Sequence, residues 1–162
     1  MRSALVFGGS GQIGRPLLDR LHGDGWRLHV VSRSEHIDAP GLHWLRGDLA
    51  GVAGVPDEVD AIFSCGPLDH FADWYARGSV RAARVVAFGS TSVEVKSGSA
   101  DAQERDIAAR LREGERRVFD TASAQGAAAT IFRPTLVYGA GRDRTLARIV
   151  AIARRWHRMV LP

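Results

Sequence analysis

Several residue types are scarce in this chain of 162 residues, and each scarcity narrows what the protein can be. The single cysteine, Cys65, excludes a disulfide within the chain and suits a reducing compartment, so we expect a cytoplasmic protein. No apolar run approaches the roughly 20 residues that a membrane-spanning helix needs, so we expect no membrane partner. Lys96 is the only lysine, and Tyr75 and Tyr138 are the only tyrosines. A catalytic mechanism that requires both a tyrosine and a lysine therefore has only these three residues as candidates.

The formal net charge of +4 is concentrated near the C-terminus. Residues 142–162 contain six arginines and one aspartate, whereas acidic residues slightly outnumber basic ones in residues 1–141. A basic face on one helix is ordinarily a solvated face, so we expect no nucleic-acid partner. Four histidines recur every seven residues, but they fall on a predicted helix, a strand, a loop and another strand. We therefore predict no metal site from His22, His29, His36 and His43.

A glycine-rich turn near the N-terminus is the most informative motif. The apolar run 4–7 predicts a buried strand; Gly8, Gly11 and Gly14 follow at three-residue spacing, and a helical pattern begins at Ile13. Glycines at this spacing permit a tight turn, close approach of a pyrophosphate to the backbone, and close packing of helix on strand. The N-terminus of the helix then offers N–H groups to phosphates. This context indicates a dinucleotide-binding turn.

Short apolar strands alternate with helical patterns along the rest of the chain. This alternation predicts right-handed βαβ crossovers and a parallel sheet covered by helices on both faces. The expected strands are 4–7, 27–31, 42–46, 60–64, 84–88 and 129–133. The expected helices are one that begins at Ile13 and is ended by Gly23 and Gly25, then 71–77, 102–125 and about 144–158.

Four short sequence motifs follow one another along the chain: Gly8-Gly-Ser-Gly-Gln-Ile-Gly14, Gly47-Asp-Leu49, Phe88-Gly-Ser-Thr-Ser-Val93 and Arg133-Pro-Thr-Leu-Val-Tyr-Gly139. Together they resemble the landmarks of the extended short-chain dehydrogenase/reductases, the NAD-dependent epimerase/dehydratase superfamily. The resemblance implies that Asp48 contacts the adenine side of the cofactor. It also implies that Ser90 carries a catalytic hydroxyl and that Pro134 lies beside the nicotinamide end.

The chain departs from this family pattern on the long helix predicted at 102–125. Redox-active members carry a Tyr-x-x-x-Lys pair there, in which the lysine lowers the pKa of the tyrosine so that the phenol works near neutral pH. This chain has Ile107, Leu111 and Glu115 in that region and no tyrosine. The acid–base role is unfilled, and its candidates are Ser90, Tyr75 or a residue beyond 162.

The residues that follow the second predicted strand decide the type of cofactor. An acid there would bind both ribose hydroxyls of NAD, whereas Ser32 and Arg33 offer a hydroxyl and a cation to a 2′-phosphate. We therefore predict NADP in preference to NAD. The alternatives are that Arg33 is a solvated loop residue and that Asp48 only forms a turn.

The fourth predicted strand ends at Cys65, Gly66 and Pro67, where the carboxyl ends of parallel strands form a ligand crevice. Cys65 also fits a small buried hydrophobe at a strand end. The next residues, His70, Trp74 and Tyr75, are candidates for the substrate side of that crevice, although Trp74 and Tyr75 also fit a helix that packs on the core. The full set of predicted cofactor-binding residues is Gly8, Ser10, Gly11, Gln12, Ile13, Gly14, Ser32, Arg33, Asp48, Leu49, Cys65, Gly66, Pro67 and Pro134.

Together these interpretations predict an α/β fold with a Rossmann-type doubly wound parallel sheet, forming one NAD(P)-binding domain over residues 1–162. We expect the last helix to lead toward a C-terminal substrate region that is missing from the chain, and the surface left uncovered to favour a homo-oligomer. The expected activity is hydride transfer involving a sugar nucleotide or a small carbonyl or hydroxyl substrate. The alternative is a non-catalytic NADP-binding redox sensor or regulatory protein.

Overall fold

The computed structural model describes residues 1–78 and 80–138. In this part of the chain, six strands form one sheet: β1 (Ser3–Phe7), β2 (Arg27–Ser32), β3 (Leu42–Arg46), β4 (Glu58–Ser64), β5 (Arg81–Phe88) and β6 (Ala128–Phe132). The helices are α1 (Gly14–Gly23), α2 (Leu68–Tyr75), α3 (Ser92–Val95) and α4 (Ala102–Ala124). No helix in these two ranges is both long and apolar enough to cross a membrane.

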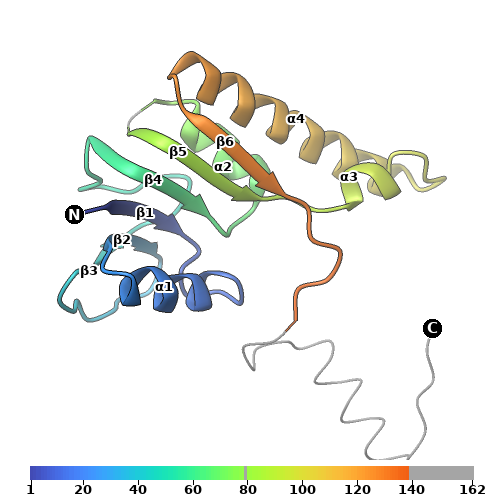
Figure 1. Ribbon diagram of the computed structural model, residues 1–162. Helices are drawn as coiled ribbons and strands as arrows, with labels where there is room; N and C mark the ends of the chain where they lie inside the picture. The colour runs from blue at the N-terminus through green and yellow to red at the C-terminus, as the bar shows by residue number, and fades with distance from the viewer. Residues whose placement is uncertain (79, 139–162) are drawn as a thin grey trace, which may run out of the picture.

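The strands are parallel and lie in the order β3-β2-β1-β4-β5-β6, so the chain winds outward from β1 in both directions (Figure 1). This is the doubly wound Rossmann order that the sequence predicted, and it places a topological switch point between β1 and β4. In register, Phe7 at the end of β1 pairs with Val31 on one side and Ser64 on the other. The carboxyl ends of these three strands therefore lie at the same edge of the sheet.

Strand β1 is the centre of the fold because both of its faces are buried. Leu5 and Phe7 belong to the core between the sheet and helices α2 and α4, whereas Ala4 and Val6 belong to the core under α1. The Phe7 ring meets Trp74 of α2 edge to face, with ring centroids 4.5 Å apart. An unbroken apolar run is what a central parallel strand requires, and it explains why this element could be recognised in the sequence.

Several elements differ from their predicted bounds: β4 begins at 58 rather than 60, and β5 begins at 81 rather than 84. Helix α2 begins at Leu68, three residues before the expected start, because Pro67 is its N-cap residue rather than part of a longer break. Proline at a helix start is favourable, since its missing N–H would have no partner there. Helix α3 was not predicted, because four residues are too few to show a periodic apolar pattern. The helix predicted at about 144–158 lies outside the described residues.

An ion-pair cluster ties the exit of β6 to the helices beside it. Arg133 donates to both carboxylate oxygens of Glu115 on α4, at 2.7 and 2.5 Å, and to Glu94 on α3 at 2.6 Å. Glu115 is only 5% exposed, and these hydrogen bonds satisfy its buried oxygen atoms. The hydrogen bonds to Glu115 raise the pKa of Arg133 above its ordinary value.

The turn between β1 and α1 depends on glycine for close packing. A Cβ added to Gly14 would lie 2.1 Å from the carbonyl oxygen of Gly8 and 2.6 Å from the Cα of Gly9. A Cβ on Gly9 would lie 2.5 Å from the Val30 side chain of β2. Backbone atoms cannot move aside as a flexible side chain can, so Gly14 is required for α1 to begin against the end of β1.

We predict that Gly14→Ala destabilises the protein while Gly23→Ala does not. Both glycines lie in α1, but nothing lies within 4 Å of a Cβ added at Gly23. Overpacking of this kind costs about 1–3 kcal/mol, whereas alanine in place of a helical glycine is neutral or stabilising by up to about 1 kcal/mol. Urea denaturation followed by circular dichroism measures both changes, and equal midpoints for the two variants would contradict this packing.

Candidate functional site

A cavity of about 620 Å³ opens at the carboxyl ends of β1 to β4, next to the topological switch point. Most of the predicted cofactor-binding residues meet there, although they come from four separate loops. The predicted residues that line it are Gly8, Ser10, Gly11, Ser32, Arg33, Asp48, Leu49, Cys65, Gly66 and Pro67. The fold thus brings together segments that are up to about sixty residues apart in the sequence.

Some predicted residues do not line this cavity, and some lining residues were missed. Gln12, Ile13, Gly14 and Pro134 are not part of its wall. The wall also includes residues that the prediction left out of the cofactor set, namely Phe7, Val31, Ser34, Gly47, Ala50 and His70. Most of these are neighbours of predicted residues in strand-end loops, so assigning each whole loop to the site would have found them.

Gly8 and Gly11 shape the part of the cavity formed by the glycine turn. Gly8 has a φ of +73°, and an added Cβ would lie 3.0 Å from the Cys65 carbonyl group, so glycine is required there for the turn itself. A Cβ on Gly11 would meet only the Gly8 carbonyl oxygen, at 3.1 Å. The space beside Gly11 is therefore open, and a ligand can approach the backbone closely at this position.

The N-terminus of α1 is electrostatically suited to an anion. The helix has no side-chain cap at Ile13 and no acidic residue in its first turn, while Arg20 and His22 lie in its last turn. Its first N–H groups carry a partial positive charge that no carboxylate of the first turn neutralises. This end of the helix follows directly on the glycine turn, so the turn and the helix offer their N–H groups to the same region.

The end of β2 carries a cation that lies in the cavity wall. Ser32 is 8% exposed, and Arg33 follows it on the surface. The nearest acid in the sequence, Glu35, forms an ion pair with Arg46 of β3. Within residues 1–78 and 80–138, Arg33 forms no ion pair, so its guanidinium is available to a ligand.

The loop after β3 is held in place by hydrogen bonds from both sides. Asp48 Oδ1 accepts from the N–H groups of Ala50 and Gly51, at 2.8 and 3.2 Å. Arg77, which follows α2, donates to the carbonyl groups of Ala50 and Leu49, at 2.8 and 3.2 Å. Asp48 therefore forms the turn and also lines the cavity, so the two interpretations of this residue are compatible. Sequence reasoning missed Arg77 because no local pattern links it to a loop 27 residues away.

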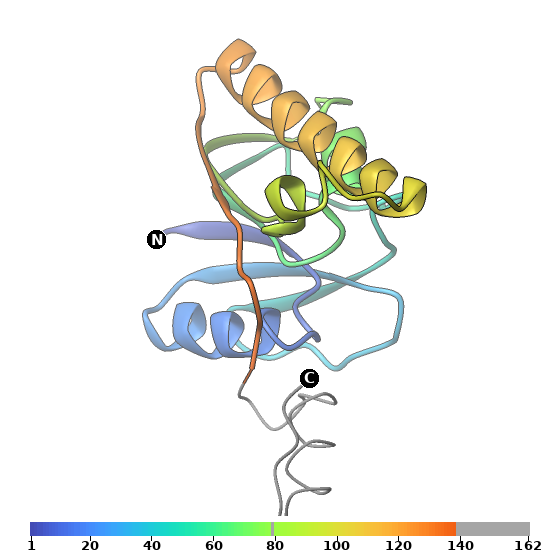
Figure 2. The same cartoon turned by 90° about the vertical axis from the view of Figure 1, so that its right-hand side faces the viewer.

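The segment after β6 reaches the glycine turn. The Gln12 side chain donates from Nε2 to the carbonyl oxygen of Val137, at 2.8 Å. Figure 2 shows the chain leaving β6 and running past the edge of the sheet toward the side where α1 lies. Gln12 thus contributes to the site by holding the segment that contains Pro134, rather than by lining the cavity.

The two candidate acid–base residues lie outside the cavity wall. Ser90 follows β5, where its hydroxyl donates to Ser92 Oγ at 3.0 Å and accepts from the Ser92 N–H at 3.1 Å. Tyr75 is 1% exposed, stacks on Phe71, and has a hydroxyl without a partner among the described residues. Burial raises the pKa of Tyr75. Tyr75 ends α2, away from the carboxyl ends of the strands, and its burial favours the alternative that it packs in the core.

Of the other residues predicted near the crevice, some line the cavity and one packs in the core. His70 lines the cavity, whereas Trp74 is 4% exposed and packs in the core. Cys65 lines the cavity as a neutral thiol, because burial raises its pKa to about 12. It contributes an apolar wall and no nucleophile.

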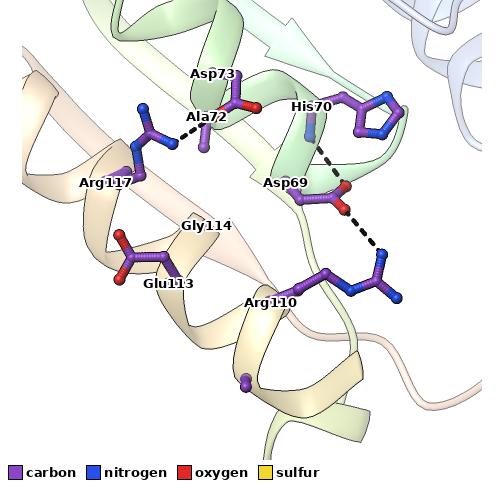
Figure 3. Close-up of a pocket in the computed structure, with 9 residues that line it drawn as sticks. Asp69, His70, Ala72, Asp73, Arg110, Glu113, Gly114 and Arg117 are labelled. Atoms are coloured by element: carbon purple, nitrogen blue, oxygen red, sulfur yellow. Dashed lines mark hydrogen bonds and ion pairs between the residues drawn. The ribbon is translucent and has the colours of Figure 1, made fainter. Parts of the chain in front are cut away.

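A second cavity, of about 490 Å³, lies between α2 and α4. Figure 3 shows Arg110 reaching Asp69 and Arg117 reaching Asp73 across the two helices. A Cβ on Gly114 of α4 would lie 3.4 Å from the backbone of Asp69, so the helices approach closely beside the cavity. Its acidic and basic side chains neutralise one another, which makes this cavity part of the contact between the helices.

Comparison with known proteins agrees with the fold. Residues 4–85 match the family described as NAD dependent epimerase/dehydratase. No curated protein matches the chain. Among solved structures, UDP-N-acetylglucosamine 4-epimerase from Bacillus cereus aligns with a TM-score of 0.69 at 15% identity, over 96% of this chain and 63% of that one.

Two further solved structures show the same likeness. UDP-glucuronic acid 4-epimerase from Bacillus cereus, in complex with NAD, has a TM-score of 0.68 at 11% identity, over 94% of this chain and 62% of that one. Vestitone reductase from alfalfa (Medicago sativa L.) has a TM-score of 0.61 at 13% identity, over 82% and 56%. The present chain thus spans less than two thirds of the length of these proteins. The family match covers half of the chain, and the chain belongs to the NAD dependent epimerase/dehydratase family.

Proposed function

We propose that the cavity at the ends of β1 to β4 binds a nicotinamide dinucleotide, with NADP preferred over NAD. The observation that carries the proposal is that the glycine turn and Arg33, which forms no ion pair within the described residues, line one cavity, and that α1 begins directly after this turn. The residues present fit such a ligand: Gly11 leaves room for a pyrophosphate beside the backbone. Asp48 and Leu49 would lie on the adenine side, and the segment held by Gln12 would lie toward the nicotinamide.

The chemistry that we propose for the parent enzyme, as distinct from these 162 residues alone, is hydride transfer to or from a sugar nucleotide or a small carbonyl or hydroxyl substrate. The family match supports this class of reaction, and solved relatives of the same fold include enzymes named for UDP-sugars. The dinucleotide supplies or accepts the hydride at the nicotinamide ring, and the protein orients it and sets the surrounding charge. Ser90 follows β5 and lies beside the segment held by Gln12, since the N–H of the next residue, Thr91, donates to the Pro134 carbonyl oxygen at 3.4 Å.

A second candidate function is a non-catalytic dinucleotide sensor or regulatory protein. The observation that favours it is the composition of α4, which contains no tyrosine and no lysine over Ala102–Ala124. At the positions where the resemblance implies a proton shuttle, the helix carries Ile107 and Leu111. An apolar pair cannot exchange protons, so this helix supports binding without the family's usual acid–base step.

Three broader expectations belong to the same proposal. Residues 1–162 form one domain, and the protein is cytoplasmic, as its single cysteine suggests.

Self-association is favoured by large apolar side chains on the surface, among them Phe132 at 53% exposed and Leu136 at 54%. Light scattering tests the last point, and a monodisperse monomer would count against it.

We predict that Gly11→Val lowers the affinity for NADPH by at least about tenfold, or about 1.4 kcal/mol, because the new side chain occupies the pyrophosphate space. The φ of Gly11 is not left-handed, but its added Cβ would lie 3.1 Å from the Gly8 carbonyl oxygen, so circular dichroism must first show that the variant is folded. Gly98→Val, at a glycine with nothing within 4 Å and outside the cavity wall, is the matched control. Fluorescence titration of NADPH checks both, and an unchanged affinity in a folded Gly11→Val variant would remove the glycine turn from the site.

We predict that NADP binds more tightly than NAD by roughly 1 to 3 kcal/mol, the range for hydrogen bonds to a charged group, and that Arg33→Ala removes most of this difference. The affinity for NAD should stay nearly the same, because NAD lacks the 2′-phosphate that Arg33 would bind. Arg27→Ala, at the opposite end of β2, is the control. Calorimetry at one salt concentration is the measurement; equal wild-type affinities would make Arg33 a solvated loop residue.

We predict no steady NADPH oxidation by this chain with UDP-sugars or small carbonyl compounds, because α4 lacks a tyrosine and a lysine. Absorbance at the reduced nicotinamide band follows the reaction, with heat-denatured protein as the blank. Substrate-dependent turnover that Ser90→Ala abolishes would exclude the non-catalytic candidate and make Ser90 a catalytic residue.

A further inference from the structure

The hydroxyl of Ser32 lies where the end of β2 meets the cavity, and two neighbours already contact it. The Ser34 N–H donates to Ser32 Oγ at 3.2 Å, and His36 Nε2 lies 3.0 Å from the same oxygen. Ser32 lines the cavity, whereas His36 does not. Any effect of His36 on a ligand at this end of the cavity therefore passes through the serine hydroxyl.

The His36 ring is held in position by β3. It stacks on the Trp44 ring with centroids 3.9 Å apart and an interplanar angle of 21°. The Trp44 N–H donates to Asp38 Oδ1 at 2.8 Å, which folds the loop between β2 and β3 back against β3. Because the ring is fixed between Ser32 and Trp44, a change in its protonation acts on Ser32 without first requiring a movement of the loop.

The number of protons decides what the Ser32 hydroxyl can offer to a ligand. A hydroxyl has one proton and two acceptor positions, and the Ser34 N–H occupies one of these positions. A neutral His36 ring can either donate a hydrogen bond to Ser32 Oγ or accept a hydrogen bond from the Ser32 hydroxyl, depending on its tautomer. A protonated ring carries hydrogen on both nitrogens and can only donate. The proton of Ser32 must then find an acceptor elsewhere, and the open direction is the cavity.

This constraint distinguishes the two dinucleotides. A fully ionised 2′-phosphate can only accept hydrogen bonds, so NADP binds more tightly when the Ser32 hydroxyl must donate. A 2′-hydroxyl can either donate or accept, so the affinity for NAD changes little. Protonation of His36 also adds a positive charge next to Ser32, which attracts the 2′-phosphate of NADP more strongly than the neutral 2′-hydroxyl of NAD.

The charged neighbours of His36 leave this effect intact. On its own loop, Glu35 is paired with Arg46 of β3, and Asp38 lies 3.3 Å from His43 of β3. Arg33 forms no ion pair within the described part of the chain. On β2, His29 stacks on His43 rather than on His36. Neither acid near His36 is therefore placed to take over the partnership with Ser32.

We propose that His36 is a positioning residue for cofactor selection: its protonated ring makes the Ser32 hydroxyl a donor to the 2′-phosphate, so that the preference for NADP over NAD grows as the pH falls. This inference rests on the proposed binding of a dinucleotide. By linkage, bound NADP favours the protonated ring, whereas bound NAD does not.

The test compares the ratio of the NAD and NADP dissociation constants between pH 5.5 and pH 8.5, the range in which histidine takes up a proton. The wild type is compared with His36→Phe, which can retain the stack on Trp44 but has no ring nitrogen. His43→Phe is the matched control, because it removes a neighbouring histidine that does not touch Ser32. The phosphate itself takes up a proton near pH 6, but that contribution is common to all variants.

We expect the wild type and His43→Phe to favour NADP more at low pH than His36→Phe does, by about three- to tenfold, which corresponds to one hydrogen bond. Ser32→Ala should lose the same pH-dependent part, since the effect passes through its hydroxyl. An NMR titration should show the His36 ring taking up its proton at higher pH with NADP than with NAD.

The outcomes separate the inference from the proposed function. If NADP binds and His36→Phe keeps the pH profile of the wild type, the inference is wrong and the proposed function stands. If the wild-type protein binds neither dinucleotide, the proposed function is wrong and the inference is wrong with it.

Discussion

The contact between the start of α1 and the end of β1 is the constraint on which the site depends. Gly14 places the first turn of the helix against the Gly8 carbonyl group, at a distance that no side chain would permit. This contact places the N-terminus of α1 at the switch point of the sheet, where the connections after the neighbouring strands β1 and β4 lead to helices on opposite faces. The other loops of the cavity only complete a surface whose centre is set by this packing. The suitability of the helix N-terminus for an anion follows from the geometry rather than from any charged side chain.

The other loops near the cavity are held in place by contacts with residues that are distant in the sequence. Arg77 holds the loop that contains Asp48, Trp44 holds the loop that contains His36, and Gln12 holds the segment after β6. Each brace joins residues that the sequence separates by eight to 125 positions. These contacts hold two of the loops beside the cavity and the segment after β6 in place. Such bracing reduces the ordering cost of binding.

Much of the fold was accessible from sequence because its signals are local. Strand β3 and the start of α4 match their predicted bounds, since an apolar run and a capping aspartate at position 101 mark them directly. Helix α3 and the early start of α2 escaped because one turn of helix has no period and Pro67 reads equally as a break or a cap. Within the candidate site, the glycine turn and Ser32-Arg33 could be recognised from local sequence patterns alone. The contributions of Gln12, Arg77 and His36 depend on tertiary contacts that no local pattern carries, and the depth of Tyr75 in the core is also a tertiary property.

The central claim is that the cavity at the ends of β1 to β4, and not the one between α2 and α4, binds a nicotinamide dinucleotide. Hydrogen exchange of the backbone, measured by mass spectrometry with and without NADPH, tests it most directly. The account predicts slower exchange in three strand-end loops, at residues 8–14, 32–34 and 47–50, together with an unchanged rate around residues 110–117 of α4. Slower exchange confined to α2 and α4, or no change at the glycine turn under saturating NADPH, would contradict it.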